Sequence, residues 1–196
     1  VLNAVESATK DSGLAAYLSP TNEGVVLPSV LKKALSPETK LVSIMFANNE
    51  IGTIQPAKEL ATIAHRYGIL FHTDAVQAMG YINVDVKEYN IDALSASSHK
   101  FYGPKGVGFS YINENVPFVN LIDGGHQEKD KRAGTENVPG IIGTAKALEL
   151  AYKNMNINNK KIKALRDYYI ERIFKEIPDC KLNGSRNDRL PGNANF

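Results

Sequence analysis

The alternation of short apolar runs with helical segments is the feature that most constrains the fold of this chain. The runs are partly β-branched, and turn residues such as Gly68 and Pro56 separate them from the helical patterns. The predicted strands cover residues 15–18, 41–46, 69–73, 92–97 and 107–112, and the predicted helices begin at residues 28, 56, 138 and 160. Repeated strand, helix and strand in this order predicts an α/β fold in which helices cover a parallel-rich sheet in three layers.

The end of the chain carries two long helical patterns separated by an Asn-rich stretch. The first runs from Val138 to about Asn154, and the second from Lys160 to Ile177, where Pro178 stops it. Residues 154–159 are the only plausible domain seam in the sequence. We therefore predict one domain over residues 1–157 and the beginning of a second over residues 158–196.

Composition argues against several classes of protein. The 196 residues include 43% apolar and 22% charged residues, which is typical of a globular domain. The formal net charge is +2 with basic and acidic residues interleaved, so no nucleic-acid partner is expected. A single cysteine excludes an internal disulfide, and the absence of an 18-residue apolar run argues against membrane spanning or secretion. We expect a cytoplasmic protein.

Both ends of the sequence look like cuts in a longer protein. Val1 stands where a methionine would begin a natural chain, and residues 190–196 stop where a further strand is expected to begin. We therefore interpret the chain as an internal fragment.

Polar residues follow the predicted strands at four places. In open parallel sheets, ligands bind beyond the carboxyl ends of the strands, so these residues are the candidate site. The four groups are Asn48-Asn49-Glu50, Asp74 with Gln77, Ser97-Ser98-His99-Lys100, and the loop of residues 124–135. We expect a site where these groups converge, and no metal site is indicated.

Lys100 and Asp74 have the strongest chemical case within these groups. A lysine held in a partly desolvated pocket becomes a nucleophilic amine able to form a Schiff base, although a solvated loop lysine is the common alternative. Asp74 suits either a helix N-cap or an anionic partner for a pyridinium nitrogen. His72 and His65 are interpreted as structural.

Four ordered motifs resemble those of class V cysteine desulfurases, which depend on pyridoxal phosphate. They are Asn48-Asn49-Glu50-Ile51-Gly52, His72-Thr73-Asp74-Ala75-Val76-Gln77, Ser95-Ala96-Ser97-Ser98-His99-Lys100-Phe101-Tyr102-Gly103-Pro104-Lys105-Gly106, and Arg132-Ala133-Gly134-Thr135-Glu136-Asn137. The similarity extends over essentially the whole chain and covers roughly the middle half of such an enzyme. It implies the large cofactor-binding domain of pyridoxal-phosphate fold type I over residues 1–157, followed by the start of the small C-terminal domain.

The resemblance also implies a role for each matching residue. Lys100 would form the Schiff base with pyridoxal phosphate, Asp74 would pair with the pyridine nitrogen, and Gln77 would bind the ring hydroxyl oxygen. Asn49 would face the cofactor and the substrate L-cysteine. The remaining phosphate contacts would come from Ser97, His99 and, across a homodimer, Thr135. Ser98 stands where many relatives have glycine, which is a small departure.

Parts of the family's site lie outside this sequence. The resemblance places the upstream phosphate loop and a ring-stacking histidine before Val1, and the nucleophilic cysteine that carries the persulfide after Phe196. Cys180 does not match that cysteine, and we predict that it is a buried, inert thiol on a short strand. The isolated chain is therefore expected to bind little cofactor and to be inactive.

Three functions remain open from the sequence. The first is a cysteine desulfurase that forms L-alanine and passes sulfur to an acceptor protein, for iron–sulfur cluster assembly or other sulfur transfer. The second is a selenocysteine lyase or another class V aminotransferase, and the third is a folding domain without catalytic activity.

Overall fold

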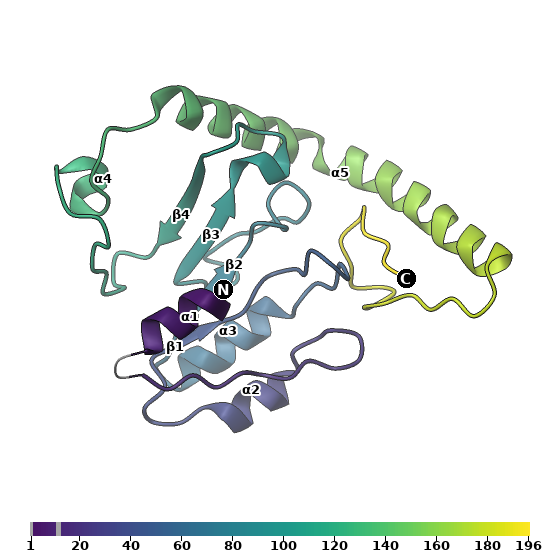
Figure 1. Ribbon diagram of the computed structural model, residues 1–196, viewed down its shortest axis with the longest axis horizontal. Coiled ribbons are helices and arrows are strands. Elements are labelled where there is room, and N and C mark those ends of the chain that lie inside the picture. The colour runs from purple at the N-terminus through teal and green to yellow at the C-terminus, as the bar shows by residue number, and fades with distance from the viewer. Residues whose placement is uncertain (1, 11–12) are drawn as a thin grey trace.

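One mixed, mostly parallel sheet forms the centre of the molecule. In the computed structural model, which describes residues 2–10 and 13–196, the strand order is β1-β2-β3-β4 (Figure 1). The strands are β1 (Leu41–Ser43), β2 (Leu70–Asp74), β3 (Ala93–Ser97) and β4 (Gly108–Ile112). β1 pairs with β2 and β2 with β3 in parallel, whereas β4 pairs with β3 in the antiparallel direction. The expected α/β fold is confirmed.

The antiparallel direction of β4 makes this a mixed sheet, in keeping with the parallel-rich sheet that the strand–helix alternation predicted. A parallel connection needs a crossover of a dozen or more residues, and residues 98–107 are too few for one. The chain instead reverses at Tyr102, which has a φ of 68°, and at Gly106, which has a φ of 75°. β4 therefore returns beside β3, and its carboxyl end lies at the opposite edge of the sheet from that of β3.

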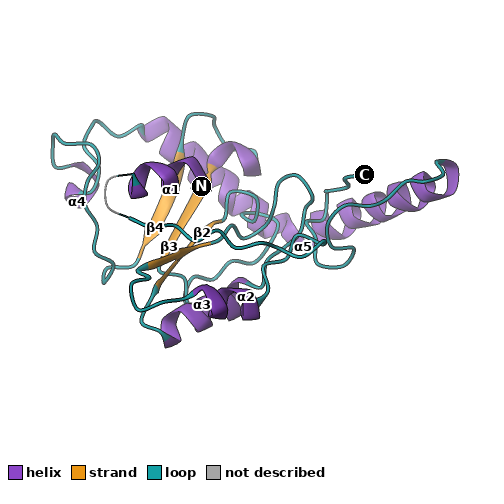
Figure 2. Ribbon diagram, turned by 60° about the horizontal axis from the view of Figure 1, so that its bottom comes forward, coloured by secondary structure: helices purple, strands orange, loops and turns teal. Residues whose placement is uncertain are grey.

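Helices α2 (Pro28–Ala34) and α3 (Ala57–Arg66) cover one face of the sheet (Figure 2). Glu59 in the first turn of α3 and Arg66 in its last turn both complement the helix dipole. Gly68 follows with a φ of 69°, the left-handed conformation that the sequence predicted at the end of this helix.

Alternation along the strands separates a buried face from a half-exposed face. Phe71 and Thr73 are fully buried on β2, and Leu94 is buried beside them on β3. Leu60 and Ala64 of α3 are also fully buried and join the same core. Each fully buried large apolar side chain contributes roughly 1.5–3 kcal/mol to stability. The opposite face carries His72, Asp74 and the serines of β3, which are half-buried.

Helix α5 (Val138–Glu176) is one continuous helix, so the prediction of two helices separated at residues 154–159 was wrong. Two asparagines of this stretch find hydrogen-bond acceptors without breaking the helix. Asn154 Nδ2 donates to the Leu150 carbonyl at 3.0 Å, and Asn159 Nδ2 donates to the Tyr81 carbonyl at 2.7 Å. The domain boundary near residue 157 stays a prediction.

The described residues also form three short helices, α1 (Leu2–Thr9), the 3₁₀ helix η1 (Ser98–Phe101) and α4 (Gln127–Asp130). The strand expected over residues 15–18 is absent, because this segment is largely exposed and has no neighbour in the sheet. Residues 177–196 form an irregular segment that returns from the end of α5 toward the sheet (Figure 1). Within it, Arg189 pairs with Thr53 in an isolated antiparallel bridge.

Candidate cofactor site

Three of the four polar groups lie at one edge of the sheet, where the parallel strands end. The parallel ladder continues past β1, because the Ile44 amide donates to the His72 carbonyl at 3.1 Å and the Phe46 amide donates to the Asp74 carbonyl at 2.8 Å. The Ala75 amide likewise donates to the Ser95 carbonyl at 2.9 Å. The loops that begin after these ladders therefore bring the groups of Asn49, Asp74 and Lys100 to the same edge, as expected for ligand sites in such sheets.

Asp74 ends β2 and caps the turn that follows. Its Oδ1 accepts a hydrogen bond of 3.0 Å from the Val76 amide, and the side chain is half-buried. The segment after Asp74 is a series of turns rather than a helix, so the helix N-cap interpretation becomes a turn cap. Gln77 is half-buried in the same series of turns.

His72 connects three strands on the face that carries Asp74. Its Nδ1 lies 2.8 Å from Ser43 Oγ of β1, and its Nε2 lies 2.8 Å from Ser95 Oγ of β3. Burial lowers the pKa of His72 below its ordinary value, and the negative charge of Asp74 partly opposes that shift. The His72 imidazole therefore links β1, β2 and β3, two residues before Asp74 on the same face of β2.

The end of β3 and helix η1 carry three of the candidate residues, Ser97, His99 and Lys100. Ser97 has extended backbone angles, and Ser97 Oγ lies 2.9 Å from His99 Nδ1. Tyr102 closes η1 in the left-handed conformation, and its amide donates to the Ser98 carbonyl. His99 and Lys100 are exposed, so the expectation that Lys100 lies in a partly desolvated pocket is not met by the described residues. Lys100 projects from a sheet edge that these residues do not cover.

A hydroxyl pair ties η1 to α5. Ser98 is fully buried, and its Oγ lies 2.9 Å from Thr144 Oγ1. The Thr144 hydroxyl also bonds to the Gly140 carbonyl at 2.7 Å. A Cβ added at Gly103 would lie 2.0 Å from Ser98 Oγ, so only glycine allows the turn to pass this serine. No local pattern in the sequence indicates Thr144, because its partner lies 46 residues away along the chain.

Asn49 is exposed at the sheet edge, and its Nδ2 donates to Glu50 Oε1 at 2.8 Å. Thr135 is exposed in the loop that joins α4 to α5, and Figure 1 shows α4 beside β4, the outer strand of the sheet. The loop of residues 124–135 follows β4, whose antiparallel direction carries the chain away from Lys100.

The functional groups at this edge fit pyridoxal phosphate. Lys100 offers an amine for the aldehyde, and Asp74 offers a carboxylate for the ring nitrogen, with Oδ1 bonded to an amide that holds it in place. Ser97 and His99 are hydrogen-bonded to each other and offer a hydroxyl and an imidazole to a phosphate. His99 is the residue directly before Lys100. Among the residues that the structure describes, no group of three or more His, Cys, Asp or Glu side chains is placed to hold a metal ion.

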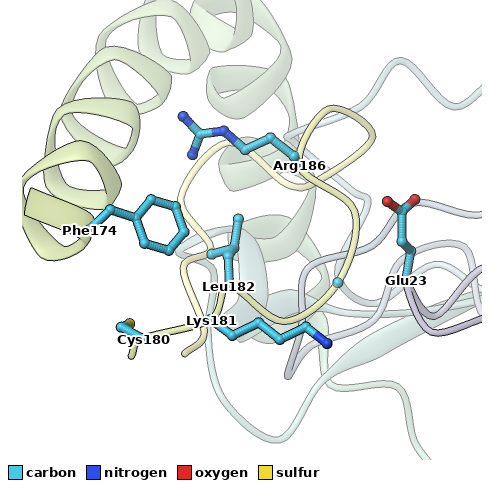
Figure 3. A pocket seen from close by; sticks show the side chains of 7 residues that line it. Glu23, Phe174, Cys180, Lys181, Leu182 and Arg186 are labelled. Atoms are coloured by element: carbon cyan, nitrogen blue, oxygen red, sulfur yellow. The ribbon is translucent and has the colours of Figure 1, made fainter. Parts of the chain in front are cut away.

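Cys180 lies beyond the far end of α5, away from this edge. It lines an open groove of about 460 Å³ together with Phe174, Leu182 and Arg186 (Figure 3). The thiol is half-exposed, so the prediction of a buried cysteine on a strand was wrong. The short segment after Pro178 has no strand partner to cover it.

No helix within residues 2–10 and 13–196 is long and apolar enough to span a membrane.

Comparison of the sequence with known proteins gives consistent results. The aminotransferase class-V family matches residues 1–196. The chain is 56% identical to a cysteine desulfurase IscS of Dictyoglomus turgidum over 180 residues, which are 92% of this chain and 46% of that protein. It is 50% identical to a cysteine desulfurase IscS of Clostridium botulinum over 198 residues, covering 100% of this chain and 50% of that protein. The chain thus spans about half the length of the curated relatives it matches.

Solved structures show the same fold. A NifS-like protein superimposes with a TM-score of 0.93 at 37% identity, covering 97% of this chain and 52% of that chain. DndA from Streptomyces lividans superimposes with a TM-score of 0.89 at 30% identity, covering 97% of this chain and 55% of that chain. The family match over the whole sequence, together with these superpositions, shows that the chain belongs to the aminotransferase class-V family and shares the fold of its NifS-like members.

Proposed function

We propose that the protein that carries this chain is a pyridoxal-phosphate-dependent cysteine desulfurase. The observation that carries the proposal is the arrangement at the end of β3 and on η1, where Ser97 and His99 form a hydrogen-bonded pair beside Lys100, at the sheet edge that also holds Asp74. The identity of about 50% to cysteine desulfurases of two bacteria supports the same conclusion.

Each side chain at this edge has a distinct task in the proposal. Lys100 Nζ binds the cofactor at its aldehyde carbon, while Ser97 and His99 hold its phosphate. Asp74 keeps the ring nitrogen protonated, and Gln77 donates to the ring hydroxyl oxygen. When bound, the cofactor supplies an electron sink for the substrate's α-carbon. Asn49 faces the cofactor and the L-cysteine substrate.

The proposed reaction moves one sulfur atom. The C–S bond of L-cysteine breaks, an S–S bond forms with an enzyme thiolate, and the carbon skeleton leaves as L-alanine. Cys180 is a poor candidate for that thiolate, because it lies in the groove beyond α5 rather than at the edge with Lys100 (Figure 3). The persulfide then passes its sulfur to an acceptor protein, for iron–sulfur cluster assembly or another sulfur-transfer route.

We also propose a homodimer in which Thr135 reaches the phosphate bound by the partner subunit. Two observations support it. Thr135 is exposed in the loop between α4 and α5. Large apolar side chains are exposed beside this loop and at the start of α5, as expected for a surface that a second subunit covers. They are Val119, Leu121, Ile122, Val138, Ile141 and Ile142.

Turnover of the whole protein tests the proposed function. Protein loaded with pyridoxal phosphate should convert L-cysteine into equimolar L-alanine and protein-bound persulfide sulfur. Formation of a keto acid without persulfide would favour an aminotransferase instead. A protein that binds the cofactor but produces no alanine from L-cysteine would refute the proposal.

A further inference from the structure

The segment of residues 183–195 crosses the loop that carries Asn49 and donates hydrogen bonds to the backbone carbonyls of that loop. Asn193 Nδ2 donates to the Glu50 carbonyl at 2.9 Å and to the Asn49 carbonyl at 3.3 Å. Arg189 Nη2 donates to the Ile51 carbonyl at 2.8 Å. These contacts join residues that are about 140 positions apart in the sequence.

Two further bonds extend the same pattern. The Leu190 amide donates to the Gly52 carbonyl at 2.9 Å, and Asn195 Nδ2 donates to the Glu50 carbonyl at 3.2 Å. Four consecutive carbonyls, from residue 49 to residue 52, thus accept hydrogen bonds from this one segment. Such a set fixes the path of the loop, because each backbone acceptor has a defined partner.

The amide groups of the same loop are held from inside. Asn48 Oδ1 accepts hydrogen bonds from the Glu50 amide at 2.8 Å and from the Ile51 amide at 3.0 Å. The Gly52 amide donates to the Asn48 carbonyl at 3.1 Å. The loop therefore has its donors satisfied by Asn48 and its acceptors satisfied by residues 189–195.

Close approach of the two segments requires glycine on both sides. Gly52 has a φ of +74°, and a Cβ added there would lie 2.5 Å from Asn193 Cγ. A Cβ at Gly184 would lie 2.5 Å from the Ile51 carbonyl oxygen, and Gly184 also has a positive φ, of +79°. These glycines let the segment approach the loop closely enough for side-chain amides to reach backbone carbonyls.

A buried threonine at the end of the loop, Thr53, holds residues 183–195 against the loop. Thr53 is fully buried; its Oγ1 donates to the Glu23 carbonyl at 2.6 Å and accepts from the Ser185 amide at 3.0 Å. The Ile54 amide donates to the Asp188 carbonyl at 2.9 Å. The segment is therefore attached to the end of the loop, and Asn193 and Arg189 hold the part of it that lies nearer to Asn49.

We propose that Asn193 and Arg189 are positioning residues that hold the Asn49 loop in the shape that presents Asn49 to the substrate. The inference rests on the proposed function, because it assigns Asn49 a place beside the cofactor. It adds that residues 183–195, which follow α5 and belong to the predicted second domain, control a residue of the first. Neither Asn193 nor Arg189 touches the substrate in this arrangement.

Two substitutions with matched controls test the positioning role in the whole protein. Asn193→Leu keeps the approximate side-chain volume and removes both donors, whereas Asn187→Leu changes an exposed asparagine on the same segment. Arg189→Lys removes the planar donor group and keeps the charge, and Arg186→Lys is its exposed counterpart. The Arg189 variant gives a second reading if Asn193→Leu folds poorly.

The first readout is amide hydrogen exchange in cofactor-free protein. We expect exchange at residues 50–54 to rise about fivefold to tenfold in Asn193→Leu and Arg189→Lys, as loss of one or two hydrogen bonds implies. Exchange in β2 and β3 should remain unchanged, as should exchange throughout both control variants. Equal exchange in Asn193→Leu and Asn187→Leu would overturn the inference.

The second readout separates positioning from a merely structural role. With cofactor bound, KM for L-cysteine should rise about tenfold in both test variants, while their thermal midpoints stay near those of the controls. Faster loop exchange with unchanged KM would show that the contacts only stabilise the loop, and would overturn the positioning role alone. Absence of turnover in the unsubstituted protein would refute the proposed function on its own evidence and the positioning role with it.

Discussion

Ser98 and Thr144 lie 46 residues apart in the sequence, and their hydroxyl groups share a hydrogen bond of 2.9 Å in the interior. Ser98 belongs to η1, the turn that carries Lys100, and Thr144 belongs to α5. The buried hydrogen bond to the long helix α5 therefore holds the turn in place, although the Lys100 side chain is exposed.

Thr144→Val should lower the free energy of unfolding by about 1–3 kcal/mol, because it leaves the buried Ser98 hydroxyl without this partner. Urea unfolding of the whole protein measures the change. The double variant Ser98→Ala with Thr144→Val removes both hydroxyl groups and should recover much of the loss. A double variant that is less stable than Thr144→Val would contradict this account.

Lys100→Ala should abolish the visible absorbance of bound pyridoxal phosphate in the whole protein, since the amine that attaches the cofactor is gone. Lys105→Ala is the control, because Lys105 is an exposed lysine on the same loop. Absorbance spectra after cofactor addition and gel filtration make the comparison. If Lys100→Ala retained the visible band, another lysine would have to carry the cofactor.

Asp74→Asn should bind the cofactor but lose about 100- to 1,000-fold in kcat, because a neutral amide does not keep the ring nitrogen protonated. The asparagine oxygen still accepts the hydrogen bond from the Val76 amide, so the turn should persist. Steady-state alanine formation and cofactor titration measure the two effects separately. Rates near those of the unsubstituted protein would exclude the proposed role of Asp74.

His72 should make the protein less stable as the pH falls. Burial lowers its pKa in the folded state, so the unfolded chain binds the proton at a higher pH than the folded chain does. The free energy of unfolding should therefore decrease as the pH falls below about 6.5, the ordinary histidine value, and level off below the folded pKa. Chemical unfolding of cofactor-free protein between pH 7.5 and pH 5, as a set of about six pH values, measures the slope.

In His72→Gln this slope should be smaller. His126→Gln is the control, because the His126 side chain is 93% exposed and its replacement should leave the slope unchanged. Identical slopes for the His72 variant and the unsubstituted protein would show that another group causes the loss.

The 196-residue chain alone should bind pyridoxal phosphate at least tenfold more weakly than the whole protein. Lys100 and His99 are both exposed in it, and the chain spans only about half the length of the curated relatives it matches. Titration followed by visible absorbance compares the two proteins. Stoichiometric, tightly bound cofactor in the isolated chain would contradict the prediction.

The sequence was sufficient to predict the four strands of the sheet in their order along the chain, and the sheet edge where three of the four polar groups lie. It was also sufficient, in retrospect, for the direction of β4, because residues 98–107 are too few for a parallel crossover.

Other features depend on partners that are distant in the sequence. The Asn-rich stretch at residues 154–159 suggested a break, but Asn159 bonds to the Tyr81 carbonyl and the helix continues. The contact between Asn193 and Asn49 spans 144 residues, and no local pattern indicates it. Propensity describes a residue and its neighbours, whereas these outcomes are decided by tertiary contacts.

The unbroken course of α5 has a mechanical consequence. A helix of 39 residues is roughly 58 Å long at 1.5 Å per residue, and without a break it acts as a stiff lever. A tilt of about 5° at its first turn displaces its last turn by about 5 Å over that length. Movement of whatever packs against residues 160–176 is therefore transmitted to the turn held by Thr144, and a change in the angle between α5 and residues 177–196 has to come from the irregular segment after Glu176.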